Sequence, residues 1–112
     1  MSLLEHSPNF NLEEASALAR DLYGLGAAGV GLPSERDQNF LVQDRSGGKY
    51  VLKIANALED RALLEAQQQA MARVAESAPR GQRIAPTRSG ALLSEIRAAS
   101  GIRHFVWMVD WL

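Results

Sequence analysis

The sequence predicts an α+β fold in which a mainly antiparallel sheet carries an N-terminal helix and one long helix. Three observations predict it: helix start and stop signals around residues 12–23, a hairpin pattern over residues 39–55, and a long stretch without glycine or proline after this hairpin. The chain has 112 residues, 46% hydrophobic and 22% charged, as in one soluble globular domain or part of a larger protein.

The first helix is expected over residues 12–23. The Asn11 side chain can accept a hydrogen bond from a free backbone N–H at the helix start, and the Glu14 side chain can reach back to the backbone of Asn11. Gly24 is well placed to end the helix, because glycine adopts the left-handed conformation of a helix C-terminus at little cost. Apolar residues recur with the helical period at Leu12, Ala15, Ala19 and Leu22.

Three strands are expected next. The glycine-rich segment 24–32, GLGAAGVGL, is typical of a weak, twisted strand, and Pro33 would end it. Residues 39–55 contain two apolar runs around a tight turn at residues 45–48, which predicts a β-hairpin. The second strand of this hairpin, KYVLKIA, carries Lys53 in its interior.

A second helix and two further strands complete the expected fold. The helix is predicted over residues 57–77, because Asn56 and the residues after it repeat the capping pattern. Residues 79–90 are expected to form a loop, and the segments 91–96 and 102–112 to form strands, the latter central and buried on both faces. The apolar side of the helix is expected at Leu64, Met71, Val74 and Ala75.

Composition excludes several classes of protein. Twelve Lys and Arg against thirteen Asp and Glu give a net charge of −1, without the basic excess of a dedicated nucleic-acid binder. There is no cysteine, so disulfide scaffolds, thiolate zinc sites and cysteine nucleophiles are excluded. No apolar run reaches the roughly 20 residues of a membrane span, and the start lacks the basic region of a signal peptide. We therefore expect a cytoplasmic domain with no nucleic-acid or membrane partner.

Two other features favour structural roles. Gly24, Gly26 and Gly29 match the GxGxxG dinucleotide-binding pattern, but they follow a helix and precede a strand, the reverse of the required context. We therefore interpret them as a helix C-cap and part of an edge strand. His6 and His104 lie far apart in the sequence without a ligand pattern, so no metal site is predicted, and His104 is expected at the surface or at a strand edge.

Lys53 is the most informative polar residue, because a lysine inside an apolar strand costs desolvation unless an anionic group meets it. Glu65, in the following helix, could pair with Lys53 and orient its ammonium group toward phosphate oxygens. Spacing alone favours a simpler alternative, in which both side chains lie at the solvent-exposed surface, because exposed charges are the norm.

The combination of these elements resembles a known family. LPSERDQNFLV, then GGKYVLKI and then LLEAQQQAM are similar to the small, N-terminal lobe of protein-kinase-like phosphotransferases, and more narrowly to the aminoglycoside phosphotransferase and choline kinase-like superfamily. Within it, they look like the hydroxylysine-kinase-like branch, which includes lobes fused to a class III, PLP-dependent aminotransferase. The resemblance covers about residues 20–112. It implies an N-terminal extension and helix over residues 1–24 and a five-stranded kinase-like lobe over residues 25–112 that ends at the hinge.

The resemblance implies a phosphate-binding side. The segment Ser34 to Gln38 resembles the loop that closes over the phosphates of ATP, with Ser34 offering its hydroxyl and backbone N–H and Asn39 holding the shape of the loop. Lys53 matches the lysine that binds the α- and β-phosphates. Glu65 matches the helix glutamate that orients this lysine.

The resemblance also implies an adenine-binding side. Asp110 and Leu112 match the start of the hinge whose backbone binds adenine, and Phe40, Val51 and Met108 would be walls of the adenine pocket or plain core. Trp107 and Trp111 share one strand face, where packing in the core or between lobes is expected. An exposed Trp111 would mark a surface that the second lobe covers.

The implied function is that of an ATP-binding lobe which positions the nucleotide but does not transfer phosphate by itself. The catalytic aspartate and the Mg²⁺ ligands of this family belong to a second lobe, which would also bind the small-molecule acceptor, so no catalytic residue is expected in these 112 residues. The full enzyme would phosphorylate a hydroxyl of an amine-bearing metabolite. The alternative is a non-catalytic interaction or regulatory module, which could be the N-terminal part of an aminotransferase; PLP would be a cofactor only in such a fusion.

Overall fold

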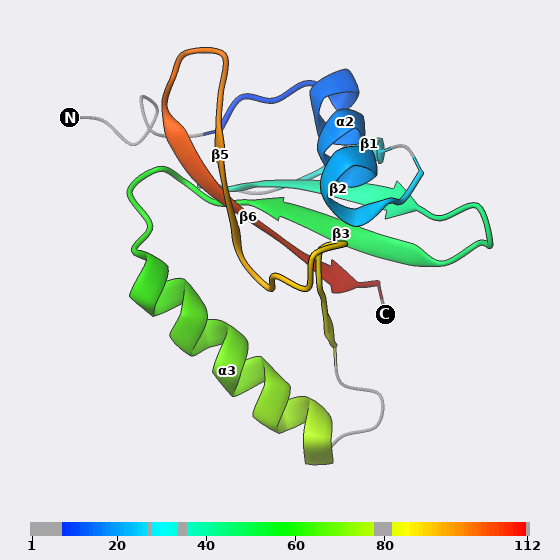
Figure 1. Ribbon diagram of the computed structural model, residues 1–112, viewed down its shortest axis with the longest axis vertical. Helices are drawn as coiled ribbons and strands as arrows, with labels where there is room; N and C mark the ends of the chain where they lie inside the picture. Colours follow the sequence, from blue (N-terminus) through cyan, green and yellow to red (C-terminus); the bar gives the residue numbers. More distant parts are fainter. Residues whose placement is uncertain (1–7, 27, 34–35, 78–81, 112) are drawn as a thin grey trace.

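The computed structural model describes residues 8–26, 28–33, 36–77 and 82–111. These residues form two helices and a six-stranded sheet, which confirms the predicted α+β class (Figure 1). The elements are, in chain order, α2 (Leu12–Tyr23), β1 (Ala28–Leu32), β2 (Gln38–Gln43), β3 (Lys49–Ile54), α3 (Arg61–Ser77), β4 (Ile84–Ala85), β5 (Ser94–Arg97) and β6 (Arg103–Asp110).

The sheet is antiparallel throughout and is organised around β6. Its strand order is β1-β2-β3-β6-β4, and β5 also pairs with β6, beyond the end of β4. Residues 104–109 of β6 are all buried, which confirms the expectation of a central strand covered on both faces. The short strand β4 lies in the segment 79–90 that we expected to be a loop. It forms because Ile84 and Ala85 pair with the backbone of β6, a long-range contact without a local signal.

Helix α2 begins and ends as its sequence predicts. The Asn11 side chain accepts a hydrogen bond from the backbone N–H of Glu14 at 2.7 Å, and a Glu14 carboxylate oxygen accepts one from the backbone N–H of Asn11 at 3.0 Å. Gly24 ends the helix with φ +68°, and its N–H bonds the last carbonyls of the helix. The capping box and the left-handed C-cap therefore define the helix locally.

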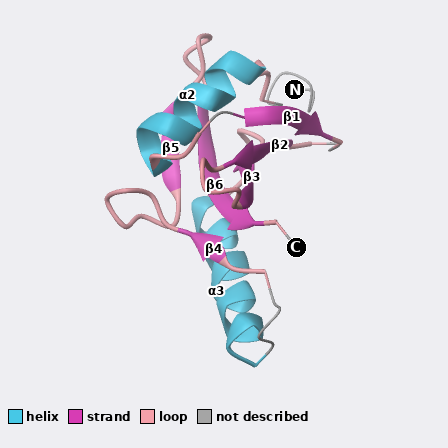
Figure 2. Cartoon of the chain, turned by 90° about the vertical axis from the view of Figure 1, so that its right-hand side faces the viewer, coloured by secondary structure: helices cyan, strands magenta, loops and turns pink. Residues whose placement is uncertain are grey.

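One face of the sheet packs against α2, and α3 lies beyond the opposite face (Figure 2). The α2 side forms the larger core, in which Ala15, Ala19 and Tyr23 meet alternate residues of the three central strands. These strand residues are Phe40, Val42, Leu52, Ile54, Val106 and Met108. The N-terminal helix and the sheet therefore share one hydrophobic core.

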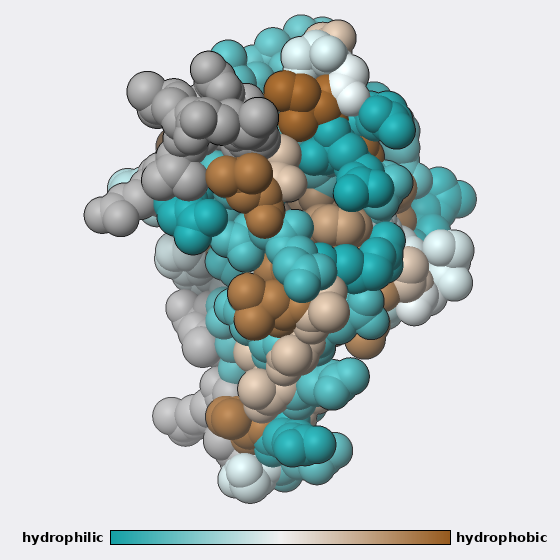
Figure 3. Space-filling model, turned by 90° about the vertical axis from the view of Figure 1, so that its left-hand side faces the viewer, coloured by the Kyte–Doolittle hydropathy of each residue, from teal (hydrophilic) through white to brown (hydrophobic). Residues whose placement is uncertain are grey.

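The face toward α3 has smaller apolar clusters. Val51, Trp107 and Val109 pack with Met71 of α3, and Leu64 of α3 packs with Ala55 and Phe105. Val74 does not join them: we expected it on the buried side of the helix, but it is 59% exposed. In the lower half of Figure 3, where α3 lies, apolar and small side chains form a diagonal band among hydrophilic ones. Helix α3 is thus only partly covered by the sheet.

Helix α3 starts four residues later than its sequence suggests. The Asn56 side chain does accept a backbone hydrogen bond, from Leu58 at 2.9 Å, but this bond closes a turn and starts no helix. The side chain is fully buried, and its amide donates to the carbonyl of Arg36 at 3.4 Å. The helix begins after Asp60, whose carboxylate accepts the N–H of Ala62 at 3.2 Å.

Among the described residues, neither helix is long and apolar enough to cross a membrane.

His104 is buried, so our expectation of a surface or edge position was wrong. It is 3% exposed, and its Nδ1 lies 2.9 Å from the carbonyl oxygen of Ala55 at the end of β3. Its ring meets the edge of Phe10 at 5.7 Å between centroids. The lead-in before α2 therefore folds over the start of β6 and covers a side chain that would otherwise be polar surface.

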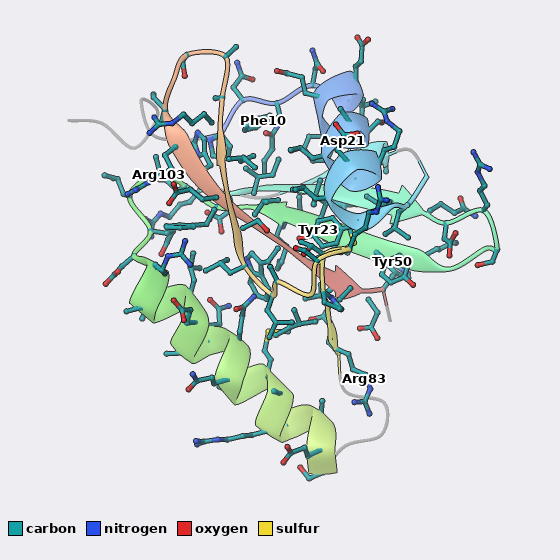
Figure 4. All side chains as sticks on the ribbon, viewed as in Figure 1. Phe10, Asp21, Tyr23, Tyr50, Arg83 and Arg103 are labelled. Atoms are coloured by element: carbon teal, nitrogen blue, oxygen red, sulfur yellow. The ribbon has the colours of Figure 1, made fainter. Side chains whose placement is uncertain are left out.

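Tyr23 places a hydroxyl inside the apolar core at the end of α2 (Figure 4). The hydroxyl oxygen is buried and has no hydrogen-bond partner among the described residues. Burial raises the pKa of Tyr23 above its usual value near 10, because a phenolate would lose its hydration there. An unpaired buried hydroxyl of this kind costs stability.

We predict that Tyr23→Phe raises the free energy of unfolding by about 1 kcal/mol, because it removes this hydroxyl and keeps the ring. Because the pKa of Tyr23 is higher in the folded than in the unfolded chain, the stability of the fold with a neutral hydroxyl is fully present below about pH 10 and is lost as the pH rises from there through the pKa of the folded state. The free energy of unfolding of the Tyr23→Phe variant should therefore fall less at alkaline pH than that of the wild-type chain.

Urea unfolding at pH 7 and at alkaline pH measures both effects. The matched control is Tyr50→Phe, at the chain's other tyrosine, which lies partly exposed on β3. Equal effects of the two substitutions at both pH values would contradict the assignment of the buried hydroxyl.

Candidate functional site

The strand register places Asn39, Lys53 and Trp107 in one row across the sheet. Asn39 of β2 lies opposite Lys53 of β3, and Lys53 lies opposite Trp107 of β6. Side chains directly opposite one another in an antiparallel sheet lie on the same face. Because Trp107 packs in the cluster that includes Met71 of α3, the whole row belongs to the face toward α3.

Lys53 is half-buried in this row. Its Nζ lies 5.7 Å from the centroid of the Trp107 ring, within the range of a cation–π contact. Burial lowers the pKa of Lys53, and the nearby negative charge of Asp37 partly opposes this effect. No carboxylate oxygen of the described residues lies within 4.0 Å of its ammonium group. The lysine is therefore a partly desolvated cation with no direct counter-ion among the described residues.

Asn39 has an unsatisfied acceptor beside this lysine. Its Oδ1 is buried and has no hydrogen-bond partner among the described residues. Buried polar atoms are usually hydrogen-bonded, so the unpaired Oδ1 of Asn39 could still accept a hydrogen bond from a donor group. Lys53 and Asn39 together form a polar pair in the middle of an otherwise apolar sheet face. An anionic group with hydrogen-bonding oxygens, such as a phosphate, fits the lysine of this pair.

Glu65 is not brought to Lys53. Its carboxylate lies 4.0 Å from the guanidinium of Arg61 on the same helix, and the side chain is 49% exposed. Arg61 also approaches Glu95 of β5 at 3.8 Å, so both carboxylates surround one arginine. Glu65 lines a hollow of about 710 Å³ between α3 and the segment 83–93, and Lys53 is not among the lining residues. The role of Glu65 in orienting Lys53 stays a prediction.

The residues named for the adenine pocket divide between the two faces. Phe40 and Met108 belong to the core beneath α2, on the opposite face from Lys53. Val51 lies on the same face as Lys53, two residues before it, and packs with Trp107. Phe40 and Met108 are therefore core residues, and Val51 is the one of the three that could contact a ligand bound by Lys53.

Asp110 is held by the segment before β4. Its backbone N–H donates to the carbonyl of Arg83 at 2.9 Å, its carbonyl accepts from the Gln82 side chain at 3.1 Å, and its carboxylate accepts the backbone N–H of Arg83 at 2.7 Å. A hinge contact through Asp110 would have to share these atoms. The next residue, Trp111, is 47% exposed, as expected of a residue that another part of the protein would cover.

Two of the predicted binding residues, Ser34 and Leu112, lie outside the described residues. The structure adds one group that the sequence reasoning missed. Asp37 lies in the bend just before β2; its negative charge opposes the effect of burial on the pKa of Lys53, and its Oδ1 accepts the backbone N–H of Asn56 at 2.8 Å. No local signal in the sequence pointed to it, because the contact joins residues 19 positions apart. Among the described residues, no group of three or more His, Asp or Glu side chains could hold a metal ion.

The glycines of the GxGxxG pattern have the structural roles that we predicted. Gly24 is the C-cap of α2, and Gly29 lies in β1, the edge strand of the sheet. Gly26 lies so close to the turn of the hairpin that a Cβ atom there would be 2.5 Å from the backbone oxygen of Gln43. The glycine at this position allows two backbone segments to approach each other, and no phosphate is needed to explain it.

Comparison with known proteins shows that the chain is similar to part of a kinase. The chain is 38% identical over 115 residues to a curated protein, hydroxylysine kinase of Danio rerio; the match covers 100% of the chain and 32% of that protein. The chain thus spans about a third of the length of this relative. No family model and no solved structure matches the chain. The match supports the resemblance to the kinase-like branch, and the α+β sheet with two helices is consistent with a kinase-like small lobe.

We predict that Gly26→Ala destabilises the fold by about 1–3 kcal/mol, because the added methyl group meets a backbone oxygen that cannot move aside without distorting β2. Gly29→Ala is the matched control, since a Cβ there would meet its nearest atom at an ordinary 3.7 Å. Thermal or urea unfolding of both variants measures the difference. A harmless Gly26→Ala would show that the close approach does not constrain the fold.

Proposed function

We propose that this chain is the ATP-binding small lobe of a small-molecule phosphotransferase, and that Lys53 is its phosphate-binding residue. The observation that carries the proposal is the half-buried ammonium group of Lys53, which faces α3 without a direct counter-ion in the part of the chain that the structure describes, in a chain 38% identical to part of a hydroxylysine kinase. A triphosphate would supply the countercharge that this lysine lacks.

The other predicted binding residues have supporting roles in this proposal. Ser34 and the residues after it would close over the phosphates, and Asn39 would hold that segment at the start of β2. Leu112 and the residues around Asp110 would meet the adenine ring, with Val51 beneath it on the face of Lys53. Glu65 would orient Lys53 only after its carboxylate leaves Arg61.

The reaction divides between this lobe and a second one. The hydroxyl oxygen of the acceptor forms a bond to the γ-phosphorus while the bond from this phosphorus to the β–γ bridging oxygen breaks, and ADP leaves. The hydroxyl proton passes to a carboxylate base, which we place in the second lobe together with the ligands of Mg²⁺. When bound, Mg²⁺ neutralises charge on the phosphate oxygens. Lys53 contributes binding and orientation of the α- and β-phosphates.

The acceptor is expected to be an amine-bearing alcohol, as the name of the relative, hydroxylysine kinase, indicates. The second lobe would cover Trp111, which is half exposed at the end of β6. Fusion to a PLP-dependent aminotransferase, and a purely regulatory role, both stay alternatives that rest on family resemblance. No residue of the described chain favours either of them over the kinase.

We predict that Lys53→Ala lowers phosphotransferase activity at least about a hundredfold in the natural polypeptide that contains these residues, because it removes a charge from the phosphate site. The assay measures ADP formation from Mg-ATP with hydroxylysine and related amino alcohols as acceptors. Lys49→Ala is the matched control: it lies on the same strand, is exposed and should leave activity unchanged. Circular dichroism of both variants checks the fold.

Wild-type activity in Lys53→Ala would refute the role of Lys53. Absence of ATP turnover in the wild-type polypeptide with every amino alcohol, together with no binding of Mg-ATP, would refute the kinase and favour the interaction module.

A further inference from the structure

The Lys53 ammonium lies near an aromatic ring, and a carboxylate that the family resemblance does not assign to it acts on its charge. The first of these groups is Trp107, which is 3% exposed and is fixed by packing against Val51 and Val109. Its ring centroid lies 5.7 Å from Nζ of Lys53. A buried indole in this position attracts a cation and restricts where the ammonium can go.

The second group is Asp37, in the bend just before β2. The first residue of β2, Gln38, pairs with Ile54, the residue after Lys53, and Oδ1 of Asp37 accepts the backbone N–H of Asn56 at 2.8 Å, just beyond the end of β3. The negative charge of Asp37 acts on Lys53 and opposes the effect of burial on its pKa.

Asp37 is held in place by Asn56 and the contacts around it. Asn56 is fully buried, and its own side chain accepts the N–H of Leu58 at 2.9 Å and donates to the carbonyl of Arg36 at 3.4 Å. Arg36 in turn pairs with Glu59 at 3.3 Å. These contacts join the residues before β2 to the turn after β3. The carboxylate of Asp37 is therefore anchored at the edge of the sheet where β2 begins and β3 ends, whereas Glu65 stands on a helix that the sheet only partly covers.

We propose that Asp37, together with Trp107, is the positioning carboxylate of Lys53 and holds its ammonium group on the α3 face before an anion binds. Glu65 is not required for this step, because it interacts with Arg61. The link to nucleoside triphosphates rests on the proposed function, but the positioning of Lys53 does not. Asp37 acts through Lys53 and is therefore a positioning residue and not a catalytic one.

The test uses the two lysines of the chain, Lys49 and Lys53. In the 112-residue chain with ¹³C-labelled lysine, two sets of ε-CH₂ signals report on one exposed and one half-buried ammonium group without any ligand. Asp37→Asn removes the charge but keeps an Oδ1 that can accept the N–H of Asn56. Its expected effect is a further fall in the pKa of Lys53 with no change at Lys49. Glu65→Gln should change neither.

Trp107→Phe is a second variant that keeps an aromatic ring in the core. The ε-protons of Lys53 should lose much of their upfield displacement, since phenyl exerts a weaker ring current than indole. Unchanged Lys53 shifts in this variant would refute the contact with Trp107. If Glu65→Gln moves the pKa of Lys53 and Asp37→Asn does not, Glu65 is the positioning carboxylate and the inference is overturned.

Nucleotide binding separates this inference from the proposed function. In the natural polypeptide, Asp37→Asn should raise the KM for ATP about tenfold, the effect of roughly one charge-assisted contact, while the control Glu13→Gln, at an exposed carboxylate of α2, stays within about twofold. Asp37→Glu, which restores the charge, should recover part of the loss. If the titration behaves as expected but wild-type protein binds no Mg-ATP, the positioning of Lys53 stands and the kinase function fails. An unchanged KM in an Asp37→Asn variant of an active kinase would overturn the role of Asp37 toward the nucleotide.

Discussion

The register between β2, β3 and β6 is the constraint on which the candidate site depends. Side chains alternate between the two faces of a strand, so a shift of one residue would send Lys53 into the apolar core beneath α2 and expose Leu52 and Ile54 on the other face. Both of these residues are fully buried, as are their neighbours on β6. The core on one face thereby specifies where the lysine of the other face lies.

The N-terminal helix α2 therefore supports the site from the opposite face of the sheet, without contacting the site residues. It supplies most of the cover for the core that maintains the register, and its lead-in binds the start of β2 directly. The backbone N–H and carbonyl of Phe10 form a reciprocal pair of hydrogen bonds with the Gln38 side chain, both 2.8 Å long. Gln38 faces the α2 side, and its strand neighbour Asn39 lies opposite Lys53 on the other face. Fixing Gln38 thus helps to fix Asn39 and the adjacent bend that carries Asp37.

Local signals in the sequence predicted much of this fold. The capping box of α2, the hairpin around residues 45–48 and the double burial of β6 depend on neighbouring residues, and all were predicted. What failed depended on contacts distant in the sequence. Asn56 has the pattern of a helix cap, but the long-range hydrogen bond between its N–H and Asp37 holds it in a turn. His104 is buried because Phe10 and Ala55 reach it from other parts of the chain.

The site residues also divide into those with a local signal in the sequence and those that only long-range contacts bring together. The sequence singled out Lys53 because a lysine within an apolar strand is conspicuous, whereas Asp37 lies in a polar segment where one more carboxylate attracts no attention. Only the fold brings Asp37 to the end of β3, where its Oδ1 accepts the N–H of Asn56 and its charge acts on Lys53. Lys53 is conspicuous for a thermodynamic reason as well. Burial disfavours its charge, which lowers the stability of the chain without ligand. In the proposed function, the phosphates of the nucleotide offset this cost when they bind. The burial of Lys53 then lowers the stability of the chain without ligand but favours the binding of phosphate. The anchored carboxylate of Asp37 reduces this cost, because its negative charge favours the charged form of Lys53.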